Sequence, residues 1–212
     1  MNIALINASP KFRESASGAL LNMMKGYLSG AEVSEYAVHK PELSEDTLAG
    51  LNAAGAWVFL FPLYIDGIPS HLLSVLARIG EAADISKNKH IYAVVNLGFY
   101  EGVQADVSLE IMKNWCERCG FTWGGGAGLG GAGGLAYMPQ MPQGKGPRAP
   151  FDSALEKLSE TAVSRGVTEN IYVSIGFPRS LYRLGGQTGW RKMIKANGLK
   201  KRDLGRKPEL NE

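Results

Sequence analysis

Residues 3–18 read IALINASPKFRESASG, and this stretch decides the fold. Its first residues, Ile3 to Ile6, are uniformly apolar, which is typical of a strand buried on both faces of a parallel sheet. A polar loop with three serines follows, and the spacing after it predicts a helix from about Ser17 to Leu28. Strand, loop and helix in this order open an alternating α/β chain.

The same strand pattern returns over Ala56–Phe61 and Ile91–Val95. Apolar residues at helical spacing follow each run. A more polar strand is predicted over Val33–Val38, as expected at a sheet edge, and a fifth over Phe121–Gly126. Alternation of strands and helices predicts right-handed crossovers. We therefore predict an α/β, doubly wound sheet of five parallel strands covered by helices on both faces.

The composition is that of a globular protein, with 212 residues of which 45% are hydrophobic and 20% charged. The longest apolar run, Ala53 to Ile65, is interrupted by Pro62, so no membrane span is predicted. No secretory signal is recognised at the N-terminus. The two cysteines are too few for a disulfide scaffold. We expect a cytoplasmic protein.

The net charge of +3 is unevenly distributed. Residues 179–212 carry 10 basic and 3 acidic side chains, whereas residues 1–178 carry 13 basic and 17 acidic ones. We therefore expect a folded domain over residues 1–175 and a basic C-terminal extension over residues 176–212.

The extension contains Trp190, Met193 and Ile194 at helical spacing. This pattern predicts an apolar side that packs on the domain or on a partner subunit. The basic charge could instead hold the extra phosphate of NADPH or contact an anionic surface. Nucleic acid is not an expected partner, because a short basic helix is most often solvated.

In an open parallel sheet, ligands bind beyond the carboxyl ends of the strands, where the strand order reverses. The loop after Ile6 places hydroxyls and a cation at a helix start, namely Ser9, Lys11, Ser15 and Ser17. Free N–H groups and the helix dipole make such a start an anion site. An equally good explanation is that Ser15 or Ser17 caps the helix.

Two further loops lie at the same predicted edge. Residues 61–69 contain two prolines and exposed apolar side chains, which indicates a rigid apolar wall. Residues 96–102 read NLGFYEG, in which glycines let backbone amides approach a ring and aromatics can stack on it. Each loop alone is explained by turn formation and core cover. Together the three loops suit a planar ring system with a terminal phosphate, and flavin mononucleotide (FMN) has that shape.

The strings NASPKFRESAS, FPLYIDGIPSHLL and NLGFYEG resemble the loops of the flavodoxin-like NADPH-dependent FMN reductase family. The resemblance covers roughly residues 1–134. It implies strand order 2-1-3-4-5, FMN as cofactor, NAD(P)H as co-substrate and a homodimer. Two positions depart from the family pattern: Ala8 stands where glycine is usual, and Ala16 stands where asparagine often precedes the last hydroxyl.

The resemblance also implies which residues contact the flavin. The phosphate loop contributes Ser9, Lys11, Ser15, Ala16 and Ser17, the second loop Pro62, Leu63, Tyr64 and Ile65, and the third loop Asn96, Gly98, Phe99 and Tyr100. The flavin itself carries the hydride chemistry, so no catalytic side chain and no metal site is expected.

Three further features have competing interpretations. Cys116 and Cys119 form a CxxC near a predicted helix end, so we expect buried side chains without a redox role, because reactive pairs lie at helix starts. The three scattered histidines are expected to be structural. Residues 124–134 are rich in glycine, and they form either a strand end with a connector or, with Tyr137, Met138 and Met141, a mobile cover over the flavin.

The leading functional prediction is an FMN-dependent oxidoreductase that transfers a hydride from NAD(P)H, through bound FMN, to a small acceptor such as a flavin or quinone. The alternative is a non-enzymatic electron carrier of the flavodoxin type that serves protein partners. A third interpretation keeps the fold but assigns another phosphorylated ligand.

Overall fold

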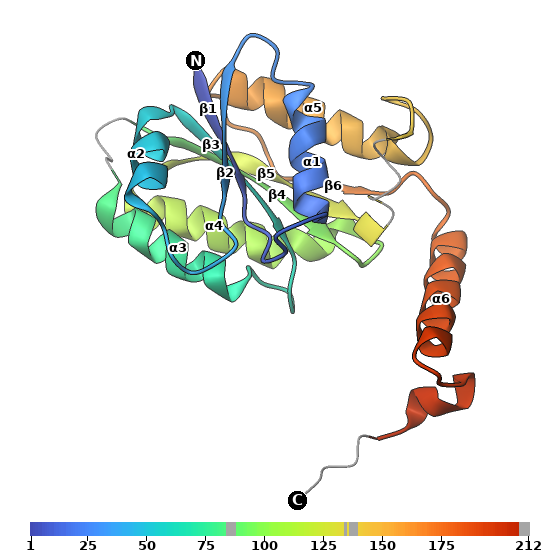
Figure 1. The fold of residues 1–212 in the computed structure, drawn as a ribbon. Helices are drawn as coiled ribbons and strands as arrows, with labels where there is room; N and C mark the ends of the chain where they lie inside the picture. Colours follow the sequence, from blue (N-terminus) through green and yellow to red (C-terminus); the bar gives the residue numbers. More distant parts are fainter. Residues whose placement is uncertain (84–87, 134, 136–139, 208–212) are drawn as a thin grey trace, which may run out of the picture. The chain divides into compact units, whose positions relative to one another are not determined.

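The computed structural model describes residues 1–83, 88–133, 135 and 140–207. Within these residues lies one parallel sheet of six strands in the order β2-β1-β3-β4-β5-β6 (Figure 1). The predicted α/β, doubly wound fold is confirmed, and the polar strand β2 lies at a sheet edge as expected. The strands are β1 (Asn2–Asn7), β2 (Glu32–Ala37), β3 (Ala56–Pro62), β4 (His90–Leu97), β5 (Thr122–Gly130) and β6 (Ile171–Ser174).

The predicted count of five strands was wrong by one, because β6 extends the sheet beyond β5. This strand has four residues, all partly exposed, and pairs with residues 127–130 of β5. A short strand at a sheet edge lacks the continuous buried run that marks β1, β3 and β4, and Glu169 and Asn170 precede it. The sequence of β6 therefore does not distinguish it from a loop.

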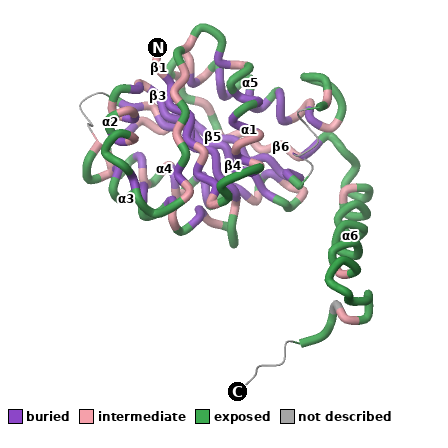
Figure 2. The backbone as a smooth tube through the Cα atoms, in the orientation of Figure 1, coloured by how far each residue is buried: buried purple, intermediate pink, exposed green. Residues whose placement is uncertain are grey.

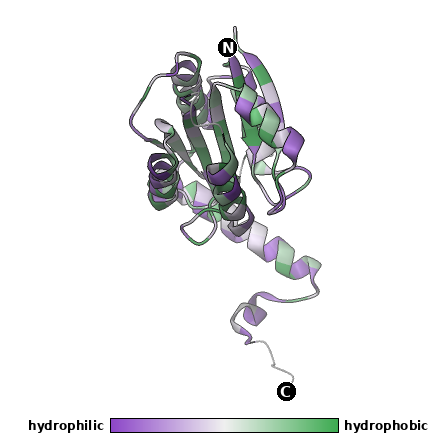
Figure 3. Ribbon diagram, turned by 90° about the vertical axis from the view of Figure 1, so that its left-hand side faces the viewer, coloured by the Kyte–Doolittle hydropathy of each residue, from purple (hydrophilic) through white to green (hydrophobic). Residues whose placement is uncertain are grey.

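Helices cover both faces of the sheet (Figures 1 and 3). One face carries α1 (Ala16–Lys25) and α5 (Ala149–Val163), and the other carries α2 (Glu45–Ala53), α3 (Ser70–Ala82) and α4 (Asp106–Cys119). Helix α1 ends at Lys25 rather than near Leu28, because the N–H of Gly26 bonds back to the carbonyl of Met23. Burial is concentrated in the sheet (Figure 2).

The core beneath α2, α3 and α4 is built from the central strand β3, every residue of which is buried. Its alternate residues Trp57, Phe59 and Phe61 all belong to this cluster. The indole N–H of Trp57 donates to the carbonyl of Leu51, 2.8 Å away, so even the polar atom of this buried ring is satisfied. Burial of each such side chain contributes about 2 kcal/mol.

The glycines of β5 bring the third loop of the site close to the sheet. The strand continues to Gly130, beyond the predicted end at Gly126. A Cβ at Gly128 would lie 2.4 Å from the carbonyl oxygen of Gly102, and one at Gly130 would lie 2.2 Å from that of Tyr100. The short helix η2 (Gly102–Ala105) therefore rests directly on β5, which fixes the preceding residues.

The chain divides into two compact units, Met1–Gly176 and Phe177–Glu212. The second unit contains α6 (Arg179–Ala196) and the short helix η5 (Lys201–Gly205). Across the part of the chain that the structure describes, no helix combines the length and apolar character needed to cross a membrane.

Candidate functional site

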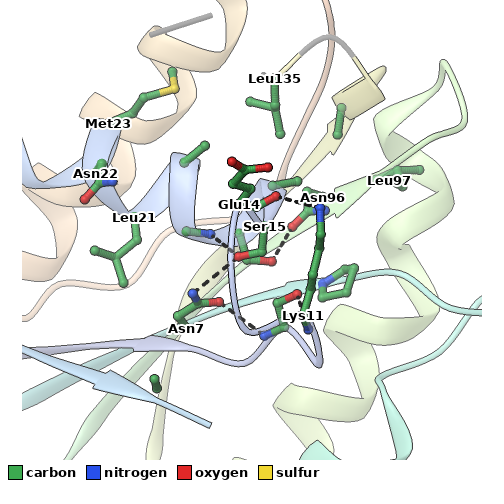
Figure 4. Close-up of a pocket in the computed structure, with 18 of the residues that line it drawn as sticks. Asn7, Lys11, Glu14, Ser15, Leu21, Asn22, Met23, Asn96, Leu97 and Leu135 are labelled. Carbon is green, nitrogen blue, oxygen red and sulfur yellow. Dashed lines mark hydrogen bonds between the residues drawn. The ribbon is translucent and has the colours of Figure 1, made fainter. Parts of the chain in front are cut away.

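The loop between β1 and α1 is folded around the side chain of Asn7. Its Nδ2 donates to Oγ of Ser15 (3.4 Å), and its Oδ1 accepts from the backbone N–H of Ser9 (3.2 Å) (Figure 4). The N–H of Lys11 donates to Oγ of Ser9 (3.2 Å). One amide thus joins the first and last serines before the helix, a role that the sequence did not reveal.

Ser15 caps α1, since its Oγ accepts from the N–H of Gly18 at 3.0 Å. The capping interpretation is therefore correct for this residue. Just before it, Glu14 adopts a left-handed backbone conformation with φ of 49°, and its carbonyl accepts from Nζ of Lys11 at 3.0 Å. The first turn of α1 lines a cavity. The positive end of the helix dipole therefore lies beside a lysine at this cavity.

Ser17 has a different role from Ser15. It is buried, and its hydroxyl donates to Oδ1 of Asn96 in β4 at 2.7 Å (Figure 4). The backbone carbonyl of Asn96 accepts from the N–H of Leu63 at 2.9 Å. Asn96 therefore connects all three predicted loops.

The loop after β3 is a tight turn. Tyr64 and Gly67 exchange two backbone hydrogen bonds of 3.1 Å each, and the two residues between them, Ile65 and Asp66, have φ of 49° and 58°. Positive φ at both central residues is the signature of a type I′ turn. Pro62 is buried, whereas Ile65 at the tip is 101% exposed.

The loop after β4 presents Gly98 to the cavity. A Cβ built at Gly98 would meet no atom of the described residues within 4 Å. Phe99 is exposed and Tyr100 partly exposed. The carbonyl of Phe99 accepts from the N–H of Gly131 at 2.6 Å, which ties this loop to the end of β5.

These loops enclose one cavity of about 1370 Å³ at the carboxyl edge of the sheet. Among the described residues, all predicted flavin contacts line it except Ile65, Phe99 and Tyr100. The lining contacts are Ser9, Lys11, Ser15, Ala16, Ser17, Pro62, Leu63, Tyr64, Asn96 and Gly98. The cavity also extends to residues that the sequence did not suggest, including Asn7, Leu135, Gln143 and Arg148.

His39 supports the phosphate loop from its outer side. Its Nδ1 lies 2.6 Å from the carbonyl oxygen of Ser9, and its ring centroid lies 4.9 Å from that of Phe12. His71, by a similar contact, places Nε2 3.2 Å from the carbonyl oxygen of Val38. Burial lowers the pKa of His71, which disfavours its charged form.

Arg148 lines the cavity as part of a buried ionic cluster. Its Nε and Nη2 donate to the two carboxylate oxygens of Asp152, both at 2.7 Å. The same carboxylate accepts from the hydroxyl of Tyr27 and from the N–H of Gly144, again at 2.7 Å. Through this carboxylate, Tyr27, which follows the end of α1, and Gly144, which precedes α5, are both joined to α5.

The charges of this cluster perturb its titration. Burial raises the pKa of Asp152, but the hydrogen bonds from Arg148, Gly144 and Tyr27 and the charge of Arg148 outweigh it, so the pKa lies below its ordinary value. Burial and the hydrogen bond to that carboxylate raise the pKa of Tyr27 to about 12. Tyr27 therefore stays a hydrogen-bond donor at neutral pH.

The CxxC pair lies at the end of α4, as expected. Cys116 is buried and Cys119 is partly buried, and burial raises the pKa of both thiols. A raised thiol pKa disfavours the reactive thiolate. In the described ranges, no group of three or more His, Cys, Asp or Glu side chains is placed to hold a metal ion.

The proposed cover falls partly on Tyr137 and Met138, which lie outside the described residues. Met141 is described and is partly exposed. Its carbonyl accepts from Nη1 of Arg148 at 3.0 Å. The ionic cluster thus holds one end of the segment that was predicted to cover the site.

Comparison with solved structures shows that the chain has a flavodoxin-like fold. A WrbA-like flavodoxin from Agrobacterium tumefaciens is 18% identical, with a TM-score of 0.54 over 77% of this chain and 97% of that chain. The Trp repressor binding protein from Bacillus subtilis is 14% identical, with a TM-score of 0.57 over 74% and 98%. A flavone reductase is 11% identical, with a TM-score of 0.61 over 80% and 66%. No protein-family model and no curated protein sequence matches the chain.

Proposed function

We propose that this chain with a flavodoxin-like fold is an FMN-dependent oxidoreductase that transfers a hydride from NAD(P)H to a small acceptor, in the manner of the NADPH-dependent FMN reductases. One observation carries the proposal. The loops after β1, β3 and β4 meet at one cavity, with hydroxyls and a helix start at one end and an apolar and glycine-lined wall at the other. This is the position at which ligands bind in doubly wound sheets.

The polar end of the cavity suits a phosphate monoester. Ser9 and Ser15 bring hydroxyls that can donate to it, and the first turn of α1, which includes Ser17, brings backbone N–H groups. Lys11 is exposed, so its ammonium can exchange the carbonyl of Glu14 for a phosphate oxygen at small cost.

The two departures from the family pattern are compatible with this use. In the described backbone, neither Ala8 nor Ala16 has a positive φ, so glycine is not required at position 8. Ala8 is buried, and its N–H donates to the carbonyl of Leu60 at 2.9 Å. Ala16 contributes an N–H at the helix start rather than a side-chain contact.

The other end of the cavity suits a planar ring. Pro62, Leu63 and Tyr64 form a wall, and the backbone at Gly98 leaves room beside it. When bound there, FMN supplies the hydride-accepting and electron-donating chemistry. The residues of the chain bind the phosphate, orient the ring and shield one side of it from water.

The acceptor in this proposal is a small molecule such as a free flavin or a quinone, which uses the same open site as NAD(P)H in turn. We also propose that the enzyme acts in the cytoplasm as a homodimer. The two unpaired thiols, Cys116 and Cys119, are compatible with a reducing compartment.

The test is titration of the purified chain with FMN and with riboflavin, followed by anaerobic addition of NADPH and NADH. Tighter binding of FMN than of riboflavin supports the phosphate site. Bleaching of the flavin absorbance by a nicotinamide cofactor, with turnover when a quinone is added, supports the reductase. Stable flavin bands with NADPH would favour the electron carrier. Failure to bind any flavin would overturn the proposal and favour a different phosphorylated ligand in the cavity.

A further inference from the structure

The carbonyl of Ser9 is directed away from the cavity that Ser9 lines. The N–H of Ser9 donates to Oδ1 of Asn7, and its hydroxyl accepts from the N–H of Lys11, both at 3.2 Å (Figure 4). Its carbonyl oxygen instead lies 2.6 Å from Nδ1 of His39. His39 does not line the cavity, whereas Ser9 does. The carbonyl therefore points to the outer side of the loop.

The direction of this carbonyl decides how the loop meets an anion. The residue after Ser9 is Pro10, which has no N–H, so the peptide unit between them offers an oxygen and no donor. A carbonyl oxygen carries a partial negative charge, and inside the cavity it would repel a phosphate oxygen. The loop is therefore suited to a phosphate only while the carbonyl of Ser9 is held outside.

The imidazole of His39 is the donor that holds this carbonyl. A carbonyl oxygen accepts hydrogen bonds and cannot donate one, so Nδ1 of His39 carries the hydrogen. The ring is partly buried and packs on Phe12, with ring centroids 4.9 Å apart and planes inclined by 46°. Phe12 belongs to the same loop as Ser9. His39 therefore contacts the loop at two points, one on the backbone and one on a side chain.

The backbone that carries His39 is held from two sides. Asn7 lies opposite Ala37 in the pairing of β1 with β2, and the N–H of the next residue, Val38, donates to the carbonyl of Asn7 at 2.9 Å. The carbonyl of Val38 lies 3.2 Å from Nε2 of His71, in the first turn of α3. Val38 itself is buried. The imidazole of His39 therefore projects from a fixed support, as a group that positions a binding loop must.

We propose that His39 is a positioning residue for the phosphate of the ligand. By holding the carbonyl of Ser9 outside the cavity, it keeps a repelling oxygen away from the phosphate and the hydroxyl of Ser9 beside it. His39 favours a phosphorylated flavin over an unphosphorylated one without contacting either. The inference rests on the proposed function in one respect, because it takes a phosphate monoester as the anionic group of the ligand.

The test compares three substitutions of His39 by titration with FMN and with riboflavin. Asparagine places an amide N–H near the position of Nδ1, glutamine places it near that of Nε2, and leucine has no donor. The Kd for FMN should rise about tenfold in His39→Leu and in His39→Gln, because the carbonyl of Ser9 loses its donor. His39→Asn should bind FMN as the unmodified chain does. The Kd for riboflavin should be the same in all of them.

Hydrogen exchange followed by NMR gives a second readout that needs no flavin. The amides of Ser9 and Lys11 are protected by hydrogen bonds within the loop, so their exchange reports on its conformation. Without ligand, both should exchange faster in His39→Leu and in His39→Gln, but not in His39→Asn. Inorganic phosphate should slow their exchange in the unmodified chain and not in His39→Leu. His90→Leu is the matched control, because it removes an imidazole at the start of β4, the opposite edge of the sheet. Circular dichroism checks that each variant is folded.

The outcomes separate this proposal from the proposed function. Unchanged FMN affinity in His39→Leu, an equal loss of FMN and riboflavin affinity, or full rescue by glutamine would overturn the role of His39 while leaving a flavin site. An unmodified chain that binds no flavin would overturn the proposed function. In that case, protection of the two amides by inorganic phosphate that is lost in His39→Leu would still support the role of His39, and absence of protection in the unmodified chain would overturn it.

Discussion

The hydroxyl of Ser17 donates to Oδ1 of Asn96 at 2.7 Å, across a separation of 79 residues. This buried bond joins the first turn of α1 to the end of β4. Asn96 also holds the loop after β3 through its backbone carbonyl. The serine-lined side of the cavity and the side formed by the loop after β3 are therefore positioned by one shared contact.

Ser17→Ala should lower the free energy of unfolding by about 1–3 kcal/mol, because it leaves the buried Oδ1 of Asn96 without its donor. The same change should weaken FMN binding. Urea denaturation and a flavin titration measure the two effects. Ser153→Ala, at an exposed position of α5, is the control and should change neither. Equal stability of Ser17→Ala and the unmodified chain would contradict the role given to this bond.

Lys11→Ala should raise the Kd for FMN about tenfold and leave the Kd for riboflavin unchanged, because a lysine near a phosphate contributes a charge-assisted hydrogen bond. Fluorescence titration with both flavins measures the difference. The control is Arg78→Ala, which removes a cation of α3 from its exposed ion pair with Glu45 of α2. This change should alter the Kd of neither flavin. A parallel loss of FMN and riboflavin affinity would show that Lys11 acts through the loop structure instead.

Gly98→Ala should leave the stability of the chain unchanged, since a Cβ there meets no described atom within 4 Å. It should nevertheless weaken FMN and riboflavin alike, because the added methyl group occupies space beside the ring. We expect an increase in Kd of about tenfold, equivalent to about 1.4 kcal/mol. Gly67→Ala, in the turn after β3, is the control, because its Cβ has room and Gly67 does not line the cavity. Unchanged affinity for Gly98→Ala would remove Gly98 from the flavin site.

Asp152→Ala should destabilise the chain by about 3–5 kcal/mol, because Arg148 would remain buried without its carboxylate. Glu156→Ala, an exposed position on the same helix, should have little effect. Urea denaturation of both variants at pH 7 measures the difference. An equal loss in the free energy of unfolding for Asp152→Ala and Glu156→Ala would show that the ionic cluster of Arg148 and Asp152 adds nothing to stability.

The same carboxylate predicts a dependence of stability on pH. The pKa of Asp152 is lowered in the folded chain, so the folded state binds fewer protons than the unfolded one as pH falls. Its contribution is complete above the ordinary value of 3.8 and is lost as pH falls through the lower folded pKa. Asp152→Asn should therefore flatten the decline in stability below about pH 4. Urea denaturation of both chains between pH 2 and pH 6, at intervals of about one pH unit, tests this prediction. Identical slopes of stability against pH for Asp152→Asn and the unmodified chain would contradict it.

Alkylation of the native chain at pH 8 should be slow, because burial raises the pKa of Cys116 and Cys119 and leaves little thiolate. The urea-unfolded chain is the control and should react at the rate of an ordinary thiol. In the Cys119→Ser variant, NADPH should reduce the bound flavin at the same rate as in the unmodified chain. Rapid alkylation of the native chain, or loss of that reduction, would restore a redox role for the pair.

The central part of the fold could be predicted because its signal is local. The runs Ile3–Ile6, Ala56–Phe61 and Ile91–Val95 each lie within an observed strand and miss its ends by at most two residues. Strands buried on both faces need apolar residues at every position, so periodicity alone identifies them. Strand β6 was missed because a short, half-exposed edge strand has no such requirement.

The cavity could be located from sequence, but its internal contacts could not. Parallel strands place their carboxyl ends at one edge, so three loops far apart in sequence were expected to meet there. The contacts of Asn7 with Ser15 and of His39 with Ser9 depend on how those loops fold. Arg148 and Asp152 are four residues apart on adjoining helical turns, a spacing common among exposed pairs. Nothing in that spacing indicates burial beside a cavity.

Because Gly128 and Gly130 have no side chains, the loop after β4 can lie directly against strand β5. The carbonyls of Gly102 and Tyr100 rest where a methyl group would otherwise be. The added methyl group of an alanine at either position would overlap these carbonyl oxygens and push η2 and the residues before it away from the sheet. Gly98, which lines the cavity two residues before Tyr100, is therefore positioned in part by glycines of a strand that does not line the cavity itself.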